Sequence, residues 1–286
     1  MPLNVSKRIL STLILWTITV VCFFVIGPDA AVWLLACLSG ATQYEFYGLL
    51  ERMGRHPFKK FGVFLGLIII LAPYYANKLS DSPIAGGIQS GIIAVTIVAC
   101  CARIFRERQV DQRVETLSVT LLGIIYVPFM LNYLVRLIEL PGEPEKGLML
   151  VVWLVVTAKF TDVGALLSGK AFGRHPMSPV TSPKKTWEGA IGGCIISVGL
   201  GFALTHFARD AFPAFFTPLW GTILALPMAI LSIVSDLVES MIKRMAAQKD
   251  SGSFIPGIGG AFDLTDSLIL TAPTGYLLLG LLALGS

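Results

Sequence analysis

Three aspartates near the end of the chain are the residues best suited to chemistry. Asp236 closes one long apolar run, and Asp263 and Asp266 open the next. The i, i+3 spacing of the last two places their carboxylates on one face of a helix. Carboxylates within apolar sequence are costly unless they pair with or bind a cation, and their hard oxygen atoms favour magnesium. We therefore predict that the three aspartates form a magnesium site.

A simpler interpretation of the same residues stays open at this point. Asp263 alone is well placed to cap the last helix. Asp236 would then pair with Lys243 or Arg244, seven or eight residues further along the chain. Glu239 is explained by a solvated helix end.

A second polar segment, residues 162–189, has the composition of a phosphate-binding loop. It is rich in glycine, hydroxyl groups and lysine, and it leads into another apolar run. Lysines act as point charges on phosphates, and backbone N–H groups at a helix N-terminus bind anions. The candidate substrate-binding residues here are Asp162, Lys170, Ser182, Lys184, Lys185, Thr186 and Glu188. Ser182 or Thr186 serves equally well as an N-cap, with Glu188 in the first helical turn.

The elements that position these residues are membrane helices. Of the 286 residues, 55% are hydrophobic and only 14% are charged, which excludes an ordinary water-soluble domain. Many of the apolar runs approach the length that crosses a bilayer as helix. The chain is expected to be an all-α transmembrane bundle of about nine spans. The predicted spans are 9–26, 30–49, 61–76, 85–101, 115–138, 147–167, 188–207, 218–238 and 264–284.

The positions of lysine and arginine predict the orientation. Among the connecting segments on one side of the membrane, the only basic residues are Lys78, Lys146 and Arg209, and the other side carries a large excess. Because positive loops stay in the cytoplasm, the N-terminus is expected inside and the C-terminus outside. Both polar segments then face the cytoplasm. Glu45, within an apolar run, is either a buried functional carboxylate or a side chain that reaches the interface.

The chain is expected to divide into N-terminal helices, residues 1–146, and a catalytic transmembrane region, residues 147–286, that carries the two polar cytoplasmic loops. Blocks of like charge that would indicate nucleic-acid binding are absent. The two halves are not related by a repeat, which weakens a transporter interpretation. Small residues such as Gly86, Gly87 and Gly91 are compatible with a homodimer.

Residues 155–270 resemble the phosphatidate cytidylyltransferases, also called CDP-diacylglycerol synthases. The C-terminal signature of that family reads S-x-apolar-K-R, four residues, K-D, a small residue, P-x-H-G-G, an apolar residue, x, and D-R-x-D. The matching residues are Ser240, Ile242, Lys243, Arg244, Lys249, Asp250, Gly252, Ile255, Pro256, Gly259, Gly260, Asp263 and Asp266. An upstream block matches at Asp162, Gly164, Gly169, Phe172, Gly173, Ser182, Pro183, Lys184, Thr186, Glu188 and Gly189.

The chain departs from the family pattern at four positions. Ile258 replaces the histidine of the signature, and Leu264 replaces its arginine. Ala261 stands in place of a larger apolar residue, and Leu166 in place of an aromatic one. The three aspartates and the Lys243–Arg244 pair are retained, so the resemblance implies a divergent, active member.

The resemblance implies that CTP and phosphatidate react to give CDP-diacylglycerol and pyrophosphate. Asp236, Asp263 and Asp266 would hold one or two magnesium ions. Lysine and arginine side chains would bind the phosphates, and two further residues would shape the cytosolic loop between Asp236 and Asp263. These are Lys184, Lys185, Lys243 and Arg244 for the phosphates, and Lys249 and Asp250 for the loop. CTP, phosphatidate and membrane lipid are the expected partners, and a bacterial-type inner membrane with a cytoplasmic active site is the expected location.

Other functions remain open on the sequence alone. A transporter of an anionic or metal substrate would place the aspartates near the bilayer midplane. An inactive lipid-binding homologue is suggested by Ile258 and Leu264. A closer enzymatic alternative keeps the cytidylyl chemistry but uses another lipid phosphate or another nucleotide.

Overall fold

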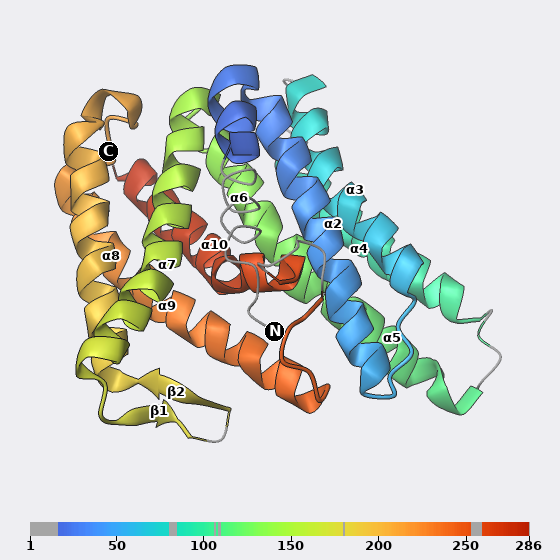
Figure 1. Cartoon of the computed structure of the whole chain (residues 1–286). Coiled ribbons are helices and arrows are strands. Elements are labelled where there is room, and N and C mark those ends of the chain that lie inside the picture. Colours follow the sequence, from blue (N-terminus) through green and yellow to red (C-terminus); the bar gives the residue numbers. More distant parts are fainter. Residues whose placement is uncertain are drawn as a thin grey trace. The chain divides into compact units, whose positions relative to one another are not determined.

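The computed structural model describes residues 17–79, 85–105, 107, 110–179, 181–252 and 259–285. Within these residues the chain is almost entirely helical, with one short hairpin (Figure 1). The long helices are α2 (Pro28–Arg52), α3 (Lys59–Leu79), α4 (Ala85–Ile104), α5 (Arg113–Ile124), α6 (Met130–Glu139), α7 (Pro144–Phe172), α8 (Trp187–Phe207), α9 (Pro218–Met245) and α10 (Ala261–Leu284). The short elements are η1 (Val21–Ile26), η2 (Val110–Gln112), η3 (Ile125–Phe129), η4 (Arg209–Ala211), β1 (Pro176–Ser178) and β2 (Ser182–Thr186).

Six helical stretches of the described residues are long and apolar enough to cross a membrane. They are Lys59–Leu79, Val110–Glu139, Pro144–Phe172, Trp187–Phe207, Pro218–Met245 and Ala261–Leu284. A shorter apolar helix covers Ile88–Ile104. The expectation of an all-α, polytopic membrane protein is therefore confirmed. Nine spans and the orientation of the termini stay predictions, and residues 9–16 of the first predicted span lie outside the described residues.

The chain forms two compact units. The first consists of Met1–Val135 with Met245–Thr265, and the second of Arg136–Arg244 with Asp266–Ser286. The expected division at residue 146 stays a prediction.

In the first unit, Tyr47 of α2 is the centre of a buried polar contact between helices. Its hydroxyl donates to the backbone oxygen of Thr120 at 2.7 Å and accepts from Gln43. Glycines of two neighbouring helices, Gly62 and Gly123, lie directly against the Tyr47 ring. Because a side chain at either glycine would collide with the ring, these residues allow α3 and α5 to approach α2 closely.

In the second unit, α7 and α8 pack through a stripe of small residues. The buried residues of α8 recur at every fourth position: Gly189, Gly193, Ser197, Gly201 and Thr205. This spacing lines one face of a helix and lets two backbones approach closely. The Ser197 hydroxyl also donates to a backbone oxygen of α7, at Thr157. The stripe therefore fixes α8 against α7, the helix that carries Asp162.

Two local features differ from the sequence expectations. Helix α7 continues to Phe172, so Lys170 lies in a helix rather than in the loop expected after residue 167, and Asp162 lies within the predicted span. The loop after α7 forms an antiparallel hairpin, β1–β2, which the all-α expectation omitted. Lysines and prolines mask this hairpin in the sequence, because alternating apolar residues are the usual strand signal.

Candidate active site

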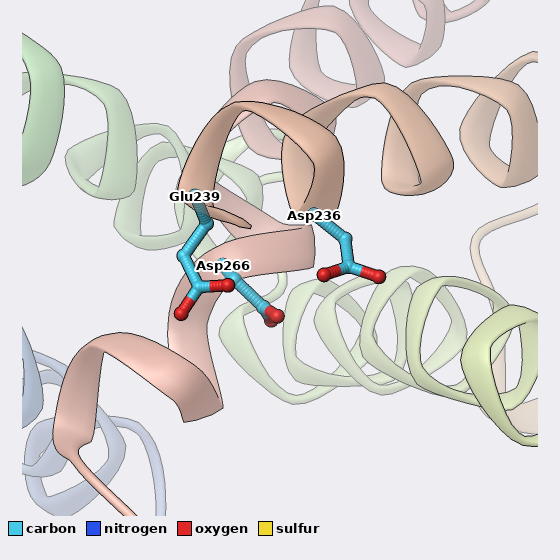
Figure 2. A group of neighbouring side chains, drawn as sticks. All are labelled: Asp236, Glu239 and Asp266. Carbon is cyan, nitrogen blue, oxygen red and sulfur yellow. The ribbon is translucent and has the colours of Figure 1, made fainter. Parts of the chain in front are cut away.

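Three carboxylates of the second unit gather between two helices. Asp236 and Glu239 project from α9 and meet Asp266 of α10 (Figure 2). One oxygen of each lies within 4.8 Å of the others. Asp266 is buried, and Glu239 is only 1% exposed, so the interpretation of Glu239 as a solvated helix end is wrong. Oxygen atoms grouped in this way suit a hard divalent cation such as magnesium.

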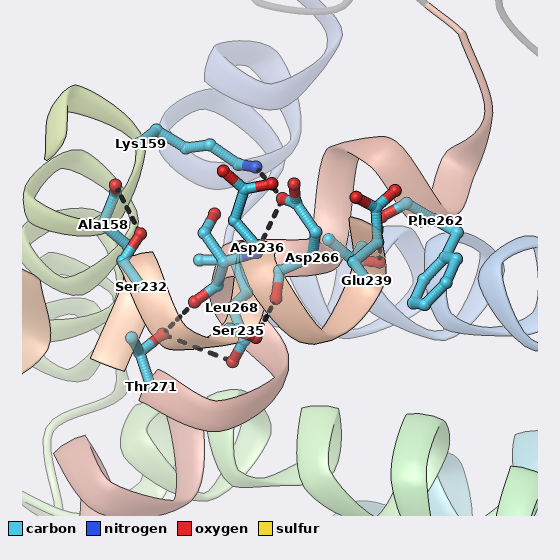
Figure 3. A network of polar contacts seen from close by, with 12 residues as sticks. Ala158, Lys159, Ser232, Ser235, Asp236, Glu239, Phe262, Asp266, Leu268 and Thr271 are labelled. Carbon is cyan, nitrogen blue, oxygen red and sulfur yellow. Dashed lines mark hydrogen bonds and ion pairs between the residues drawn. The ribbon is translucent and has the colours of Figure 1, made fainter. Parts of the chain in front are cut away.

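Each of these carboxylates also pairs with a lysine. Lys159 of α7 lies 2.7 Å from Asp266 (Figure 3). Lys243 lies 2.7 Å from Glu239, one turn away on the same helix. Lys185, at the end of β2, pairs with Asp236. Partly buried carboxylates are costly without counter-charges, so the three lysines balance the negative charge of the group.

Backbone and hydroxyl contacts hold the helices around these carboxylates. The Ser235 hydroxyl donates to the backbone oxygen of Asp266, and the N–H of Ser267 donates to the Asp266 carboxylate at 2.6 Å. Ser232 donates to the backbone oxygen of Ala158 at 3.0 Å (Figure 3). Helix α9 is therefore bonded both to α7 and to α10, which fixes the side chains that these helices carry.

A cavity of about 250 Å³ opens beside the carboxylates. Its polar walls come from α7, β2 and α9, and its remaining walls are apolar. The polar lining residues are Asp162, Lys184, Lys185, Thr186 and Asp236. All five were predicted from the sequence as site residues, and the structure brings them to one cavity.

Two residues of the predicted phosphate-binding segment have structural contacts of their own. Thr186 is the N-cap of α8 and accepts a hydrogen bond from the N–H of Gly189 at 3.2 Å, which confirms the capping interpretation. Glu188 lies in the first turn and accepts from the backbone N–H groups of Arg174 and His175, and its other oxygen lies 2.5 Å from the His175 ring. Glu188 thereby holds the turn that precedes β1.

Other predicted site residues lie at chain turns and helix ends. Lys170 and Arg244 are exposed at the ends of α7 and α9, and Ser182 begins β2. Lys249 and Asp250 are exposed after α9. Their roles toward a substrate stay predictions.

Asp263 belongs to the first unit and has the contacts of a helix cap. Its carboxylate accepts from the N–H of Gly260 at 2.7 Å, and the hydroxyl of Ser251 lies 2.9 Å from the same carboxylate. The bond to Gly260 is the backward half of a capping box, as the simpler interpretation expected. Its role as a metal ligand stays a prediction. Leu264, at the position of the family arginine, is half-buried in α10, and Ile258 lies outside the described residues.

Lys159 and Glu239 belong to the site but were not predicted from the sequence as members of it. Both left a signal. Lys159 is a charge inside an apolar span, three residues before Asp162, and Glu239 lies one helical turn after Asp236. Residues three apart share a helical face, so both positions point to the same side as a predicted site residue.

The sequence matches the model of the cytidylyltransferase family over residues 6–282. The chain belongs to this family. A phosphatidate cytidylyltransferase of Synechocystis is 30% identical over 260 residues, which cover 81% of this chain and 82% of that protein. One from Haemophilus influenzae is 37% identical over 148 residues, 51% of each chain, and one from Brucella suis is 38% identical over 139 residues. The chain thus spans about half the length of these last two relatives, because the Brucella alignment covers 49% of that protein. Because the chain belongs to this family, we interpret the carboxylates, lysines and cavity in terms of phosphate chemistry.

Proposed function

We propose that this protein transfers a cytidylyl group from CTP to phosphatidate, giving CDP-diacylglycerol and pyrophosphate. The observation that carries the proposal is the match to the cytidylyltransferase family along almost the whole chain. The relatives named as phosphatidate cytidylyltransferases support the lipid substrate. The polar cavity with its lysines and neighbouring carboxylates supplies the groups that such a reaction needs.

The donor set fits magnesium. Asp236, Glu239 and Asp266 offer only oxygen atoms, at a spacing that one small cation or a pair can share. Asp263 is the further predicted ligand. Bound magnesium would neutralise the phosphates and stabilise the pyrophosphate that leaves.

The lysines of the site are the proposed phosphate ligands. Lys184 and Lys185 line the cavity. They directly precede the N-terminus of α8, where backbone N–H groups can bind an anion. Lys243 and Arg244 belong to the last turn of α9, and Lys170 to the last turn of α7. Lysine supplies a compact charge and arginine a fork that grips two oxygens.

In the reaction, an oxygen of the phosphatidate phosphate attacks the α-phosphorus of CTP. The bond from that phosphorus to the β-phosphate oxygen breaks, and pyrophosphate leaves with its electron pair. The attacking phosphate is already anionic and needs no general base, so replacement of the family histidine by Ile258 is compatible with turnover. The task of the protein is to align two polyanions and to offset their repulsion.

An apolar groove adjoins the polar cavity and is the proposed place of one acyl chain. Its walls come from α8 and α9, with one residue of β1, and its volume is about 750 Å³. Met177, Ala190 and Ile233 line both the groove and the cavity. A lipid could thus place its phosphate at the lysines and its acyl chain between α8 and α9.

The proposed location is a bacterial inner membrane. The chain would cross it about nine times, with the site at the cytoplasmic face, and the proposed assembly is a homodimer.

The first experiment measures CDP-diacylglycerol formed from phosphatidate, CTP and magnesium by the purified protein. We expect activity in the wild type and a loss of about a hundredfold or more in Asp266→Asn, because one charged group of the cluster becomes neutral. Glu239→Gln is expected to weaken the binding of manganese, measured by electron paramagnetic resonance without substrates. Asp210→Asn, which changes an exposed acid of the same unit, is the control and should stay within about twofold of wild type.

Absence of product from folded wild type, across nucleotides and divalent metals, would overturn the proposal. A lipid-binding or transport role would then be tested next. Full activity of Asp266→Asn would be consistent with the proposed reaction but would contradict the proposed role of the carboxylate cluster in it.

A further inference from the structure

Glu45 of α2 holds two chain segments that are distant from it in sequence. One oxygen of its carboxylate accepts from the backbone N–H of Phe262 at 3.0 Å, and the Ser251 hydroxyl lies at the same distance from that oxygen. Ser251 follows α9, and Phe262 lies in the first turn of α10. Glu45 therefore bonds to the chain on both sides of residues 253–258, which lie outside the described residues.

Two glycines are required by this contact. A side chain at Gly252 would collide with the Glu45 carboxylate, and one at Gly260 would collide with both Glu45 and Ser251. At Gly252 the three nearest atoms all belong to Glu45. The backbone thus comes close to the carboxylate at two further points, and small residues occupy both.

Neighbouring contacts fix the same part of α10. The ring of Phe262 packs against Phe46 and Tyr126, with centroids 5.8 and 6.3 Å away. Thr42, one turn before Phe46, contacts the hydroxyl of Thr265 at 3.0 Å. One face of α2 therefore packs against and hydrogen-bonds to the first turn of α10, and Glu45 lies between Thr42 and Phe46 on that face.

The Ser251 hydroxyl connects Glu45 to Asp263. It lies 3.0 Å from the carboxylate of Glu45 and 2.9 Å from that of Asp263. Gly260, which lies against Glu45, donates its N–H to the Asp263 carboxylate at 2.7 Å. Ser251 and Gly260, which both contact Asp263, therefore also contact Glu45.

We propose that Glu45 is a positioning residue for cytidylyl transfer, which sets Asp263 by holding Ser251, Gly260 and Phe262. The inference rests on the proposed function. Hydrogen bonds to a carboxylate are about twice as strong as neutral ones, so a charged residue orders these segments better than a neutral one. Glu45 acts through these neighbours and not on the reacting atoms.

The test compares Glu45→Gln and Glu45→Ala with Glu51→Ala. Glu51 is an exposed acid of the same helix that pairs with Lys59, so its loss should change little. We expect Glu45→Ala to lower kcat by about tenfold to a hundredfold, as is typical for residues that orient a metal ligand. The magnesium concentration for half-maximal rate should rise as well, and Glu45→Gln, which keeps an acceptor oxygen, should lie between wild type and Glu45→Ala.

Hydrogen exchange supplies a readout that does not depend on activity. In Glu45→Ala, the peptide that contains Phe262 should exchange its amide protons faster than in wild type, because the acceptor of that N–H is gone. Peptides from α8 should be unchanged. If wild type has no cytidylyltransferase activity, the proposed function fails, and exchange at Phe262 still tests the Glu45 contact.

A double variant tests the contact at Gly252. Gly252→Ala alone should lower activity, because its new methyl group collides with Glu45. Glu45→Ala removes the obstacle, so the double variant should be no worse than Glu45→Ala alone. Additive losses, an unchanged kcat and magnesium dependence in Glu45→Ala, or losses that only follow the amount of folded protein would each overturn the inference.

Discussion

Lys159 is the residue whose role in the site is most clearly a matter of charge balance. Its ammonium group lies inside the second unit, 2.7 Å from the buried carboxylate of Asp266. Removing one member of such a pair leaves the other charge without compensation, which costs more than the pair contributes.

Replacing Lys159 by leucine should therefore destabilise the protein by roughly 3 kcal/mol and abolish most activity. The double variant Lys159→Leu with Asp266→Leu should recover much of the stability, because apolar pairs of similar volume replace buried ion pairs at little cost. It should remain inactive, since Asp266 is lost. Unfolding in detergent, followed by tryptophan fluorescence, gives the stability, and a double variant as unstable as Lys159→Leu would contradict this account.

Some of these residues could be found from the sequence and others could not. Asp236 and Asp266 were evident because carboxylates within apolar sequence are costly unless they pair with or bind a cation. The partner of Asp266 was not, because Lys159 lies 107 residues away along the chain and only helix packing brings the two together. Glu239 was missed because a charged helix end is normally solvated, and only the packing of α9 shows that it is buried.

At the scale of elements, the close packing of α7 and α8 positions the cavity walls. Asp162 comes from α7, and the N-terminus of α8 closes the other side. The stripe of small residues on α8 sets the distance between them, since Gly193 faces the backbone of α7 directly.

The prediction at this scale compares two glycines of α8. A methyl group at Gly193 would lie 2.6 Å from the backbone oxygen of Thr161, so Gly193→Ala should separate the helices, cost about 1–3 kcal/mol and lower activity. Gly199 has open space around it, and Gly199→Ala should be neutral or stabilise the helix by up to about 1 kcal/mol. Thermal unfolding and turnover of the two variants check this, and equal effects would show that the stripe does not control the packing.

The described helices were predictable because apolar length is a strong signal in membrane chains. Each predicted span from 30–49 onward overlaps a helix of the structure. The end of α7 and the β1–β2 hairpin were not predictable, because polar residues near the interface are tolerated in helix, strand and loop alike. The small-residue stripe of α8 was not predicted, because its role depends on the helix that it faces, which only the structure identifies.

At the scale of the whole molecule, the distribution of positive charge predicts which loops face the cytoplasm. The loop between α7 and α8 carries His175, and the segment after α8 carries Asp210. Helix α8 has 21 residues, about 30 Å of rise, which is the thickness of a bilayer core. The two residues should therefore lie on opposite sides of the membrane.

Single cysteines at these positions, in a variant without the native cysteines, test that expectation. Asp210→Cys should react with a membrane-impermeant maleimide in intact cells, and His175→Cys only after the cells are permeabilised. The reverse pattern would invert the orientation. Labelling of both positions in intact cells would show that α8 does not span.

The position of Lys159 within α7 also bears on how the protein is made. A ribosome delivers α7 to the membrane before α10 exists, so Asp266 is absent when Lys159 first meets the translocon. Asp162, three residues later on the same helical face, is then the nearest counter-charge. An isolated charge at the centre of an inserting helix costs about 2.5–3.5 kcal/mol, and a neighbouring opposite charge reduces that cost. Asp162 is thus the nearest acidic residue available to Lys159 while α7 inserts, before Asp266 is synthesised and becomes the partner of the lysine in the folded protein.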